Sequence, residues 1–313
     1  MAVCNVCFRH CNLKSGEVGF CGARIGVSGI APDTGAGECA DGGTVTALNY
    51  GRATALALDP IEKKPLARFY PGSMILSYGS FGCNLRCPFC QNYEISWSEE
   101  AEQFSAEARR AFAVSEEGDS DSPESGRFRT VSPEELAATA AYYRDQGNIG
   151  VAFTYNEPLV GYEYVRDTAA LVHEYGMKNV IVTNGTASLE VLGELEPYID
   201  AMNIDLKGFT DHYYNRVLGG SRKMVMDFIE RAVQFCHVEL TTLIVPGEND
   251  SEEEMRELSA WVAGLDRQIP LHITRFFPQF HMTDRRATDV RHIYRLAEIA
   301  RGNLDYVYTG NCN

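Results

Sequence analysis

Three cysteines, Cys83, Cys87 and Cys90, stand at a C-x3-C-x2-C spacing. Three thiolates from one short loop can hold three irons of a cubic [4Fe–4S] cluster, whereas four thiolates are the usual full set. The missing thiolate leaves one iron open to a ligand other than protein. A structural zinc site needs four closed ligands, and no fourth stands nearby; reduced core thiols are the other alternative. The spacing therefore predicts a cluster with an open iron.

A second compact group of cysteines comes earlier in the chain. Its members are Cys4, Cys7, Cys11 and Cys21. Four soft ligands in a stretch with little apolar content predict a small module that folds around a metal, because metal binding supplies the folding energy that a small core lacks. Zinc in a closed tetrahedral site is the first interpretation, an auxiliary iron–sulfur cluster is its rival, and free thiols are the third. His10 can replace one thiolate, and Cys39 is expected to be incidental.

The bulk composition excludes several classes of protein. The chain has 313 residues, enough to bury one large domain and a small one. Its net charge of −15 argues against non-specific binding to nucleic acid or to an anionic membrane. No apolar run reaches the roughly 18 residues that span a bilayer, and the N-terminus lacks the regions of a signal peptide. We therefore expect a cytoplasmic protein, where clustered cysteines serve as ligands rather than disulfides.

Apolar periodicity and turn signals predict the elements that position these residues. The predicted strands are 74–81, 150–154, 179–183, 201–206, 237–245, 271–276 and 306–308, and the predicted helices are 132–146, 159–175, 189–195, 210–217, 223–236, 251–265 and 289–301. Repeated strand–helix units imply a parallel sheet with right-handed crossovers. We predict an α/β fold, a partial (β/α)6 TIM-type barrel with a small Cys-rich N-terminal metal-binding module.

The predicted domain organisation has two parts. Residues 1–70 form the Cys-rich module and a turn-rich lead-in, and residues 71–313 form the partial barrel. Two lysines of the lead-in, Lys63 and Lys64, are expected to be solvated. Residues 97–130 are acidic and rich in Ser, Glu and Ala, which predicts a flexible insertion or mobile flap rather than core.

Polar and turn residues stand where the predicted strands end, and ligands gather at the carboxyl ends of the strands in such folds. They are Tyr155-Asn156-Glu157-Pro158, Thr183-Asn184-Gly185, Asn203 with Asp205, Lys207 and Gly208, Pro246 to Asp250, and Arg275 to Pro278 with His281. Each alone is commonly a bland turn or capping residue. Their joint position at one rim, together with the cysteine loop, predicts a binding site there.

The cysteine motif, with the aromatic Phe89 directly before its third cysteine, resembles that of the radical S-adenosylmethionine (SAM) superfamily, in which SAM occupies the open iron. The core from about 60 to 310 looks like the pyruvate formate-lyase activating enzyme branch. Further segments are most similar to the radical SAM member of the AmmeMemoRadiSam system. They are the Cys-rich N-terminus, Cys21 to Arg24, Asp59 to Leu66, Gly82 to Asn92, Thr154 to Pro158, and Tyr308 to Asn311.

The resemblance implies roles for single residues. Glu157-Pro158 match the end of the family's Gly-Gly-Glu-Pro motif, so binding of the SAM amino group is assigned to Glu157. The segments around Asn184 and from Asp205 to Lys207 match the activating-enzyme pattern, which implies SAM contacts for these three side chains. Phe89 joins them as a cofactor-binding residue. The candidate catalytic residues are Lys207 and His281, and the local pattern around His281 is not matched to the family's motifs.

The implied activity is reductive cleavage of SAM by a [4Fe–4S] cluster to a 5′-deoxyadenosyl radical, which abstracts hydrogen from an unassigned substrate. The alternatives are a glycyl-radical-enzyme activating enzyme and an iron–sulfur redox sensor or electron carrier. Activating enzymes with extra clusters usually place the added cysteines after the C-x3-C-x2-C motif, and here they precede it. The expected partners are SAM and a low-potential electron donor of flavodoxin or ferredoxin type. Memo- and AMMECR-domain proteins or a substrate protein are further candidates, whereas nucleic acid and membrane are not.

Overall fold

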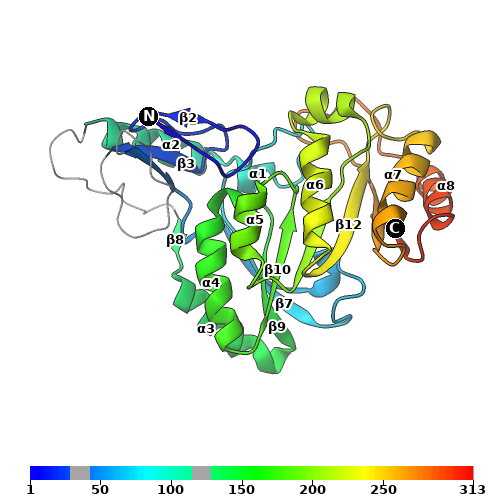
Figure 1. Ribbon diagram of the computed structural model, residues 1–313, viewed down its shortest axis with the longest axis horizontal. Coiled ribbons are helices and arrows are strands. Elements are labelled where there is room, and N and C mark those ends of the chain that lie inside the picture. Colours follow the sequence, from blue (N-terminus) through cyan, green and yellow to red (C-terminus); the bar gives the residue numbers. More distant parts are fainter. Residues whose placement is uncertain (29–42, 115–127, 313) are drawn as a thin grey trace.

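The computed structural model describes residues 1–28, 43–114 and 128–312, and a sheet of eight strands lies at its centre (Figure 1). The strand order is β14-β13-β12-β11-β10-β9-β7-β6. The bounds are β6 Ala55–Pro60, β7 Met74–Gly79, β9 Asn148–Phe153, β10 Lys178–Thr183, β11 Ala201–Asp205, β12 His237–Ile244, β13 Leu271–Arg275 and β14 Val307–Gly310. All neighbours are parallel except β6 and β7, which are antiparallel. The α/β class and the partial barrel are confirmed, as an open sheet.

Helices alternate with the parallel strands, as the sequence predicted. They are α3 Pro133–Tyr142, η2 Tyr143–Gln146, η3 Pro158–Gly161, α4 Tyr162–Glu174, α5 Leu189–Leu195, the π-helix η4 Tyr213–Leu218, α6 Arg222–Ala232, α7 Glu252–Leu265 and α8 Val290–Arg301. Serine side chains begin four of them, because each accepts a hydrogen bond from a backbone N–H of the first turn. The strands between them are mostly buried, since helices and loops cover both faces of the sheet.

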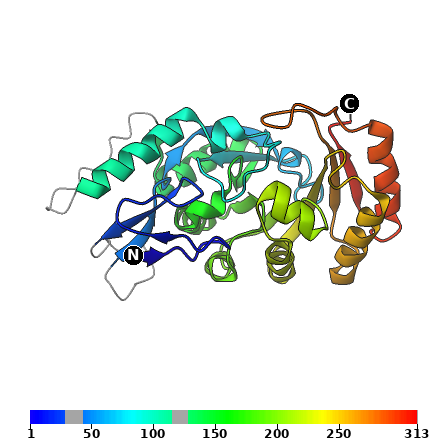
Figure 2. The same cartoon turned by 90° about the horizontal axis from the view of Figure 1, so that it is seen from above.

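The N-terminal residues form small elements beside the carboxyl edge of the sheet (Figures 1 and 2). They are β1 Ala2–Val3, β2 Asn12–Leu13, β3 Arg24–Ser28, β4 Gly43–Ala47 and β5 Arg52–Ala53, with α1 Tyr93–Ser96, α2 Glu99–Val114 and β8 Arg129–Thr130 following the cysteine loop. The 3-10 helix η1 Ile61–Lys63 lies at the amino edge instead, because Pro60 at the end of β6 pairs with Met74 at the start of β7. Strand β1 pairs with β2, β3 with β4, and β5 with β8, each antiparallel.

The prediction of a flexible segment over 97–130 is wrong for its first half. Residues 99–114 form helix α2, whose Ala101, Phe104 and Ala108 are buried in a small core with Phe81. These apolar residues recur at i, i+3 and i+7, a helical period that the many acids of the segment obscured. Its end is also ordered, since Arg129–Thr130 form β8. Residues 115–127, with the acidic run, lie outside the described residues.

Two expectations for the lead-in also need correction. Strand β6 is hydrogen-bonded along its length to β7, so it belongs to the main sheet although it precedes the predicted boundary at residue 70. Lys64 is buried, with 3% of the residue exposed, because its Nζ atom pairs with an Asp59 carboxylate oxygen at 2.9 Å. Only Lys63 is solvated, with 66% of its side chain exposed.

A fully buried carboxylate, Glu239 of β12, ties the lead-in to the sheet. It accepts hydrogen bonds from the backbone N–H groups of Ala67 and Arg68 at 2.9 and 2.8 Å. The imidazole Nε2 atoms of His272 and His237 lie 2.6 and 3.0 Å from its two oxygens. Four partners thus satisfy this charge near the amino ends of β12 and β13.

Candidate active site at the carboxyl edge of the sheet

The cysteine loop leaves β7 at the carboxyl edge and is fixed by its backbone. Gly82 has a φ of +92°, and an added Cβ there would lie 2.6 Å from the Cβ of Ala23, so the turn requires glycine. The Gly82 N–H donates to the Ser96 carbonyl at 3.0 Å. The Asn156 amide donates to the carbonyls of Phe81 and Gly82, both at 3.1 Å. The loop is therefore held from the N-terminal module, from α1 and from the end of β9.

The thiols of Cys83, Cys87 and Cys90 share one half-buried environment at this edge. Burial raises the pKa of all three, to about 11 for Cys87. The nearby ammonium of Lys207 opposes this by lowering the pKa of Cys87 and Cys90, which favours their thiolate forms. Across the described ranges, no three Cys, His, Asp or Glu side chains converge closely enough to chelate a single metal ion. Three thiols spread over one loop fit a cluster, in which each thiolate binds its own iron.

Asn184, after β10, lies directly beside this loop. Its Nδ2 atom donates to the Cys83 sulfur at 3.7 Å and to the Asn84 side-chain oxygen at 2.9 Å. Asn84 in turn donates to the Thr186 hydroxyl at 2.8 Å. All three side chains are buried. The predicted SAM ligand Asn184 is therefore within reach of the cysteine loop and held rigidly.

Glu157 joins the ends of β9 and β10. Its Oε1 atom accepts from the Thr183 hydroxyl at 2.7 Å and from the Leu159 N–H at 3.1 Å, and its Oε2 atom accepts from the Asn184 N–H at 2.8 Å. Burial raises the pKa of Glu157 to about 7 although these three donors lower it. An ionised carboxylate has about four acceptor sites, so one is left. The carboxylate supports the Asn184 backbone, and its binding of an amino group stays a prediction.

Asp205 and Lys207 form an ion pair where β11 ends. The Lys207 Nζ atom lies 2.7 Å from a carboxylate oxygen of Asp205. Burial alone would lower the pKa of Lys207, but the negative charge of Asp205 raises it above its ordinary value, so the ammonium stays charged. The Lys207 N–H also donates to the Tyr214 hydroxyl at 3.0 Å, and its carbonyl accepts from the Asn249 amide at 2.6 Å. This pair faces Cys87 and Cys90.

The two other predicted residues are placed differently. Phe89 is buried against Phe276 in an edge-to-face contact with ring centroids 6.3 Å apart, so it anchors the loop to the end of β13. The His281 N–H donates to the Pro88 carbonyl at 2.8 Å, but its exposed imidazole packs on Phe280. The backbone of His281 therefore contacts the cysteine loop, and a catalytic role for its side chain stays a prediction.

The four N-terminal cysteines lie close to one another and to the cysteine loop. The Cys4 N–H donates to the Cys11 carbonyl at 2.8 Å, and Cys7 bridges to Ala187 just beyond Asn184. Burial and the neighbouring Cys4 thiol both raise the pKa of Cys7, and burial raises the pKa of Cys21 to about 12. That they bind a metal, and which metal it is, stays a prediction.

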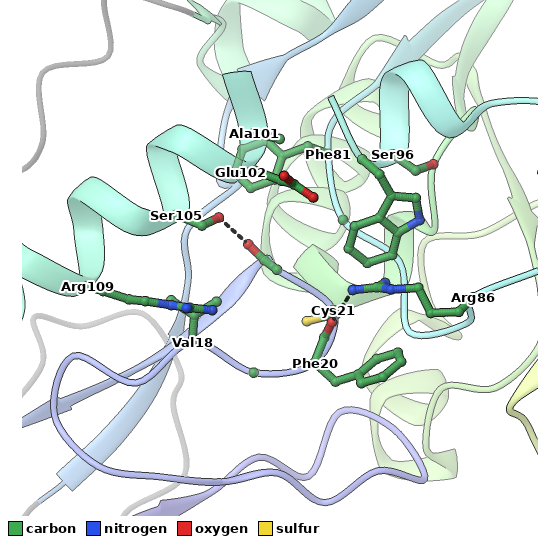
Figure 3. A pocket seen from close by; sticks show the side chains of 14 residues that line it. Val18, Phe20, Cys21, Phe81, Arg86, Ser96, Ala101, Glu102, Ser105 and Arg109 are labelled. Carbon is green, nitrogen blue, oxygen red and sulfur yellow. Dashed lines mark hydrogen bonds between the residues drawn. The ribbon is translucent and has the colours of Figure 1, made fainter. Parts of the chain in front are cut away.

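A pocket of about 440 Å³ opens between the N-terminal module, the cysteine loop and α2 (Figure 3). The Arg86 guanidinium lies in it between the rings of Phe20 and Trp97, with its carbon 4.4 and 3.1 Å from the ring centroids. It donates to the Phe20 carbonyl at 2.9 Å, and burial lowers the pKa of Arg86 to about 10. Arg109 and Glu102 line the pocket from α2.

Sequence reasoning placed Asn156 at the predicted rim but assigned no individual role to Asn84, Asn156 or Arg86, which fix the cysteine loop. Asn84 and Arg86 stand between its cysteines, and Asn156 directly precedes Glu157. Position in the motif was the one available signal, because their partners come from distant parts of the chain.

Comparisons with known proteins agree with this geometry. The sequence model of the Radical SAM superfamily matches residues 78–259. Uncharacterized protein MJ0808 of Methanocaldococcus jannaschii is 36% identical over 311 residues, which cover 98% of this chain and 80% of that protein. The 4-hydroxyphenylacetate decarboxylase activating enzyme of Clostridioides difficile is 22% identical over 179 residues, 53% of this chain and 57% of that enzyme.

Two solved structures show a similar fold. A radical SAM methyltransferase from Sphaerobacter thermophilus has a TM-score of 0.52 at 16% identity, covering 92% of this chain and 76% of that chain. Streptococcus suis SuiB has a TM-score of 0.53 at 14% identity, covering 75% and 50% of the two chains. No described helix is long and apolar enough to cross a membrane.

Proposed function

Because this chain belongs to the radical SAM superfamily, we propose that it cleaves SAM at a [4Fe–4S] cluster held by Cys83, Cys87 and Cys90. The family implies both cofactors and a reductant. When bound, they supply a 5′-deoxyadenosyl radical that abstracts hydrogen from the substrate. The observation that carries the proposal is the contact of Asn184 with the Cys83 sulfur, beside the Lys207 ammonium that faces the other two thiols.

The residues of the rim take separate parts in this proposal. Asn184 and Lys207 offer N–H donors to a carboxylate or to ribose oxygens, and Asp205 orients Lys207. Glu157 offers its remaining acceptor site to an amino group and keeps Asn184 in place. Phe89 excludes water from the base of the loop. The exposed loop around His281 lies over the cysteine loop and is the proposed side from which the substrate enters.

The test is formation of 5′-deoxyadenosine from SAM by the anaerobically reconstituted, dithionite-reduced chain. Serine at Cys83, Cys87 or Cys90 should abolish the product, because each replacement removes a thiolate that holds an iron. Cys236→Ser is the matched control, since this half-buried thiol donates to the Ala232 carbonyl after α6. Product formation by all three loop variants would overturn the site. An intact cluster without product in the native chain would favour a redox sensor or electron carrier.

For the biological type we propose the AmmeMemoRadiSam system, on the strength of the sequence motifs from Cys21 to Arg24 and from Asp59 to Leu66. Memo- and AMMECR-domain proteins are then the partners to test, together with a flavodoxin or ferredoxin as electron donor. Co-purification of a tagged native chain with either domain protein supports this type. The second candidate is a glycyl-radical-enzyme activating enzyme, which the Clostridioides difficile relative favours. Radical transfer from the reduced chain to a glycyl-radical enzyme encoded beside it would support this candidate and reject the AmmeMemoRadiSam type.

We also propose that Cys4, Cys7, Cys11 and Cys21 bind a metal centre, either zinc or an iron–sulfur cluster. The support is their mutual proximity in a module with few apolar residues. Elemental analysis of the purified chain separates the two.

A further inference from the structure

The N-terminal module and the cysteine loop are joined at the cysteines themselves. The Cys83 N–H donates to the Cys21 carbonyl at 3.1 Å. An added Cβ at Gly82 would lie 2.9 Å from the same carbonyl oxygen, so the two backbones are in direct contact. One hydrogen bond therefore separates a cysteine of the first group from a cysteine of the second.

Two arginines lie in this junction without a carboxylate partner among the described residues. Arg9 donates to the carbonyls of Asn84 and Gly219, both at 2.7 Å, and its guanidinium carbon lies 3.3 Å from the Phe20 ring centroid. Arg86 contacts Phe20 as well and stacks on Trp97 (Figure 3). In a chain with a net charge of −15, two unpaired cations between thiol groups fit anionic centres on both sides.

The thiol geometry favours a cluster over zinc in the N-terminal module. Zinc holds four sulfurs at about 2.3 Å from one point. In the described part of the chain no such convergence occurs, and the same holds for Cys83, Cys87 and Cys90, which the family assigns to a cluster. Yet a 2.8 Å hydrogen bond joins the backbones of Cys4 and Cys11, and an added Cβ at Gly19 would lie 3.6 Å from the Cys11 sulfur. The cysteines are therefore close in the fold without converging on one point, which fits a polynuclear centre better than a single zinc ion.

We propose that Cys4, Cys7, Cys11 and Cys21 hold a second, fully thiolate-ligated iron–sulfur cluster that relays electrons to the cluster of Cys83, Cys87 and Cys90 across the Cys21–Cys83 hydrogen bond. Four protein thiolates leave no open iron, so this centre binds no SAM and serves electron transfer. A low-potential one-electron donor reduces it. The same electron then passes to the cluster of Cys83, Cys87 and Cys90, which returns the N-terminal cluster to its oxidised state, and no bond is made or broken. The relay rests on the proposed function, whereas the cluster itself does not.

Iron content and electron paramagnetic resonance test the cluster independently of SAM cleavage. The reconstituted chain should bind about eight irons, and both a Cys7→Ser/Cys11→Ser variant and a Cys83→Ser/Cys87→Ser/Cys90→Ser variant should keep about four. The reduced native chain should show magnetic coupling that is absent from either variant. About one zinc and four irons per chain, or eight irons without coupling, would overturn the proposal. If the native chain fails to cleave SAM while the Cys83→Ser/Cys87→Ser/Cys90→Ser variant keeps about four irons, the N-terminal cluster is supported. Only the proposed function is then rejected.

A milder variant guards against misfolding of the module. Arg9→Gln removes a cation at the junction but no cysteine, so iron content should stay at the native value. We expect the reduction potential of the N-terminal centre to become more negative and the rate of reduction of the loop cluster by a photoreduced donor to fall at least threefold. Arg109→Gln is the matched control, since it removes an arginine that lines the pocket beside Arg86 but lacks the contacts of Arg9. Equal rates and potentials in the two variants would exclude the relay through this junction.

Discussion

Glu157 and Glu239 are two buried carboxylates of one sheet, and their charges are compensated in opposite ways. Glu239 has four partners, two of them imidazoles, which lower its pKa to about 2 although burial raises it. Among the described residues Glu157 has three hydrogen-bond donors and no cationic partner, and burial raises its pKa to about 7. The cation of that edge, Lys207, pairs with Asp205. Burial alone therefore does not mark a functional carboxylate, and we predict that the uncompensated charge of Glu157 does.

The largest effect is expected from Glu239→Ala. The change leaves two backbone N–H groups and two imidazoles without their acceptor and opens a cavity, so we expect a loss of about 3–5 kcal/mol in the free energy of unfolding. Urea denaturation of the full chain measures it. Glu257→Ala, on the exposed face of α7, is the control and should change the same free energy by less than about 0.5 kcal/mol. If Glu239→Ala lowers the free energy of unfolding by no more than the control does, Glu239 does not have the structural role proposed for it.

The second prediction concerns pH, where the two carboxylates act with opposite sign. The folded pKa of Glu239, about 2, lies below its ordinary value of 4.5. Ionised Glu239 therefore contributes about 3 kcal/mol to the free energy of unfolding above pH 4.5, and this contribution is lost as the pH falls through 2. The folded pKa of Glu157, about 7, lies above 4.5. Protonated Glu157 therefore contributes about 3 kcal/mol to the free energy of unfolding below pH 4.5, and this contribution is lost as the pH rises through 7.

Denaturation curves at several pH values check this prediction on the apoprotein. Relative to the native chain, Glu157→Gln should gain stability as the pH rises from 5 to 8, because glutamine cannot ionise. Glu239→Gln should be less stable than the native chain at pH 5, and this difference should disappear as the pH falls to 2. Parallel curves for the native chain and both variants would show that neither carboxylate has a shifted pKa.

Sequence reasoning found Glu157 but not Glu239, and the reason is physical. Glu157 follows a strand whose apolar run marks its end, and the strand ends of the predicted fold meet at one rim, where the cysteine loop also lies. The structural role of Glu239 depends on hydrogen bonds with Ala67, Arg68 and His272, which are distant in the sequence and come together only in the fold. The strands and helices of the sheet were predictable because their periodicity is local. Helix α2 was missed because three buried apolar positions were outweighed by its acids.

The third prediction is a loss of SAM affinity in Glu157→Gln. If the carboxylate binds the SAM amino group, removing its charge should weaken binding at pH 8 by at least tenfold, about 1.4 kcal/mol. Native affinity should also weaken as the pH falls below 7, while that of the variant stays flat. Anaerobic calorimetry on the reconstituted chain measures both. Unchanged affinity, with Asn184→Ala as the sensitive reference, would leave Glu157 only its role of holding the Asn184 backbone.

The smallest effect separates these two roles of Glu157. Thr183→Val removes the hydroxyl that donates to its Oε1 atom at 2.7 Å, at a cost of about 1 kcal/mol in stability. The loss of this donor should raise the pKa of Glu157 further, so SAM affinity should fall two- to threefold at pH 7 and recover at pH 8.5. Thr242→Val is the matched control, because this buried hydroxyl donates at 2.7 Å to the Leu206 carbonyl instead. A similar stability loss in both variants, with the pH-dependent affinity change in Thr183→Val alone, would locate the effect in the charge of the carboxylate. Equal affinity changes would assign it to general loosening of the strand ends.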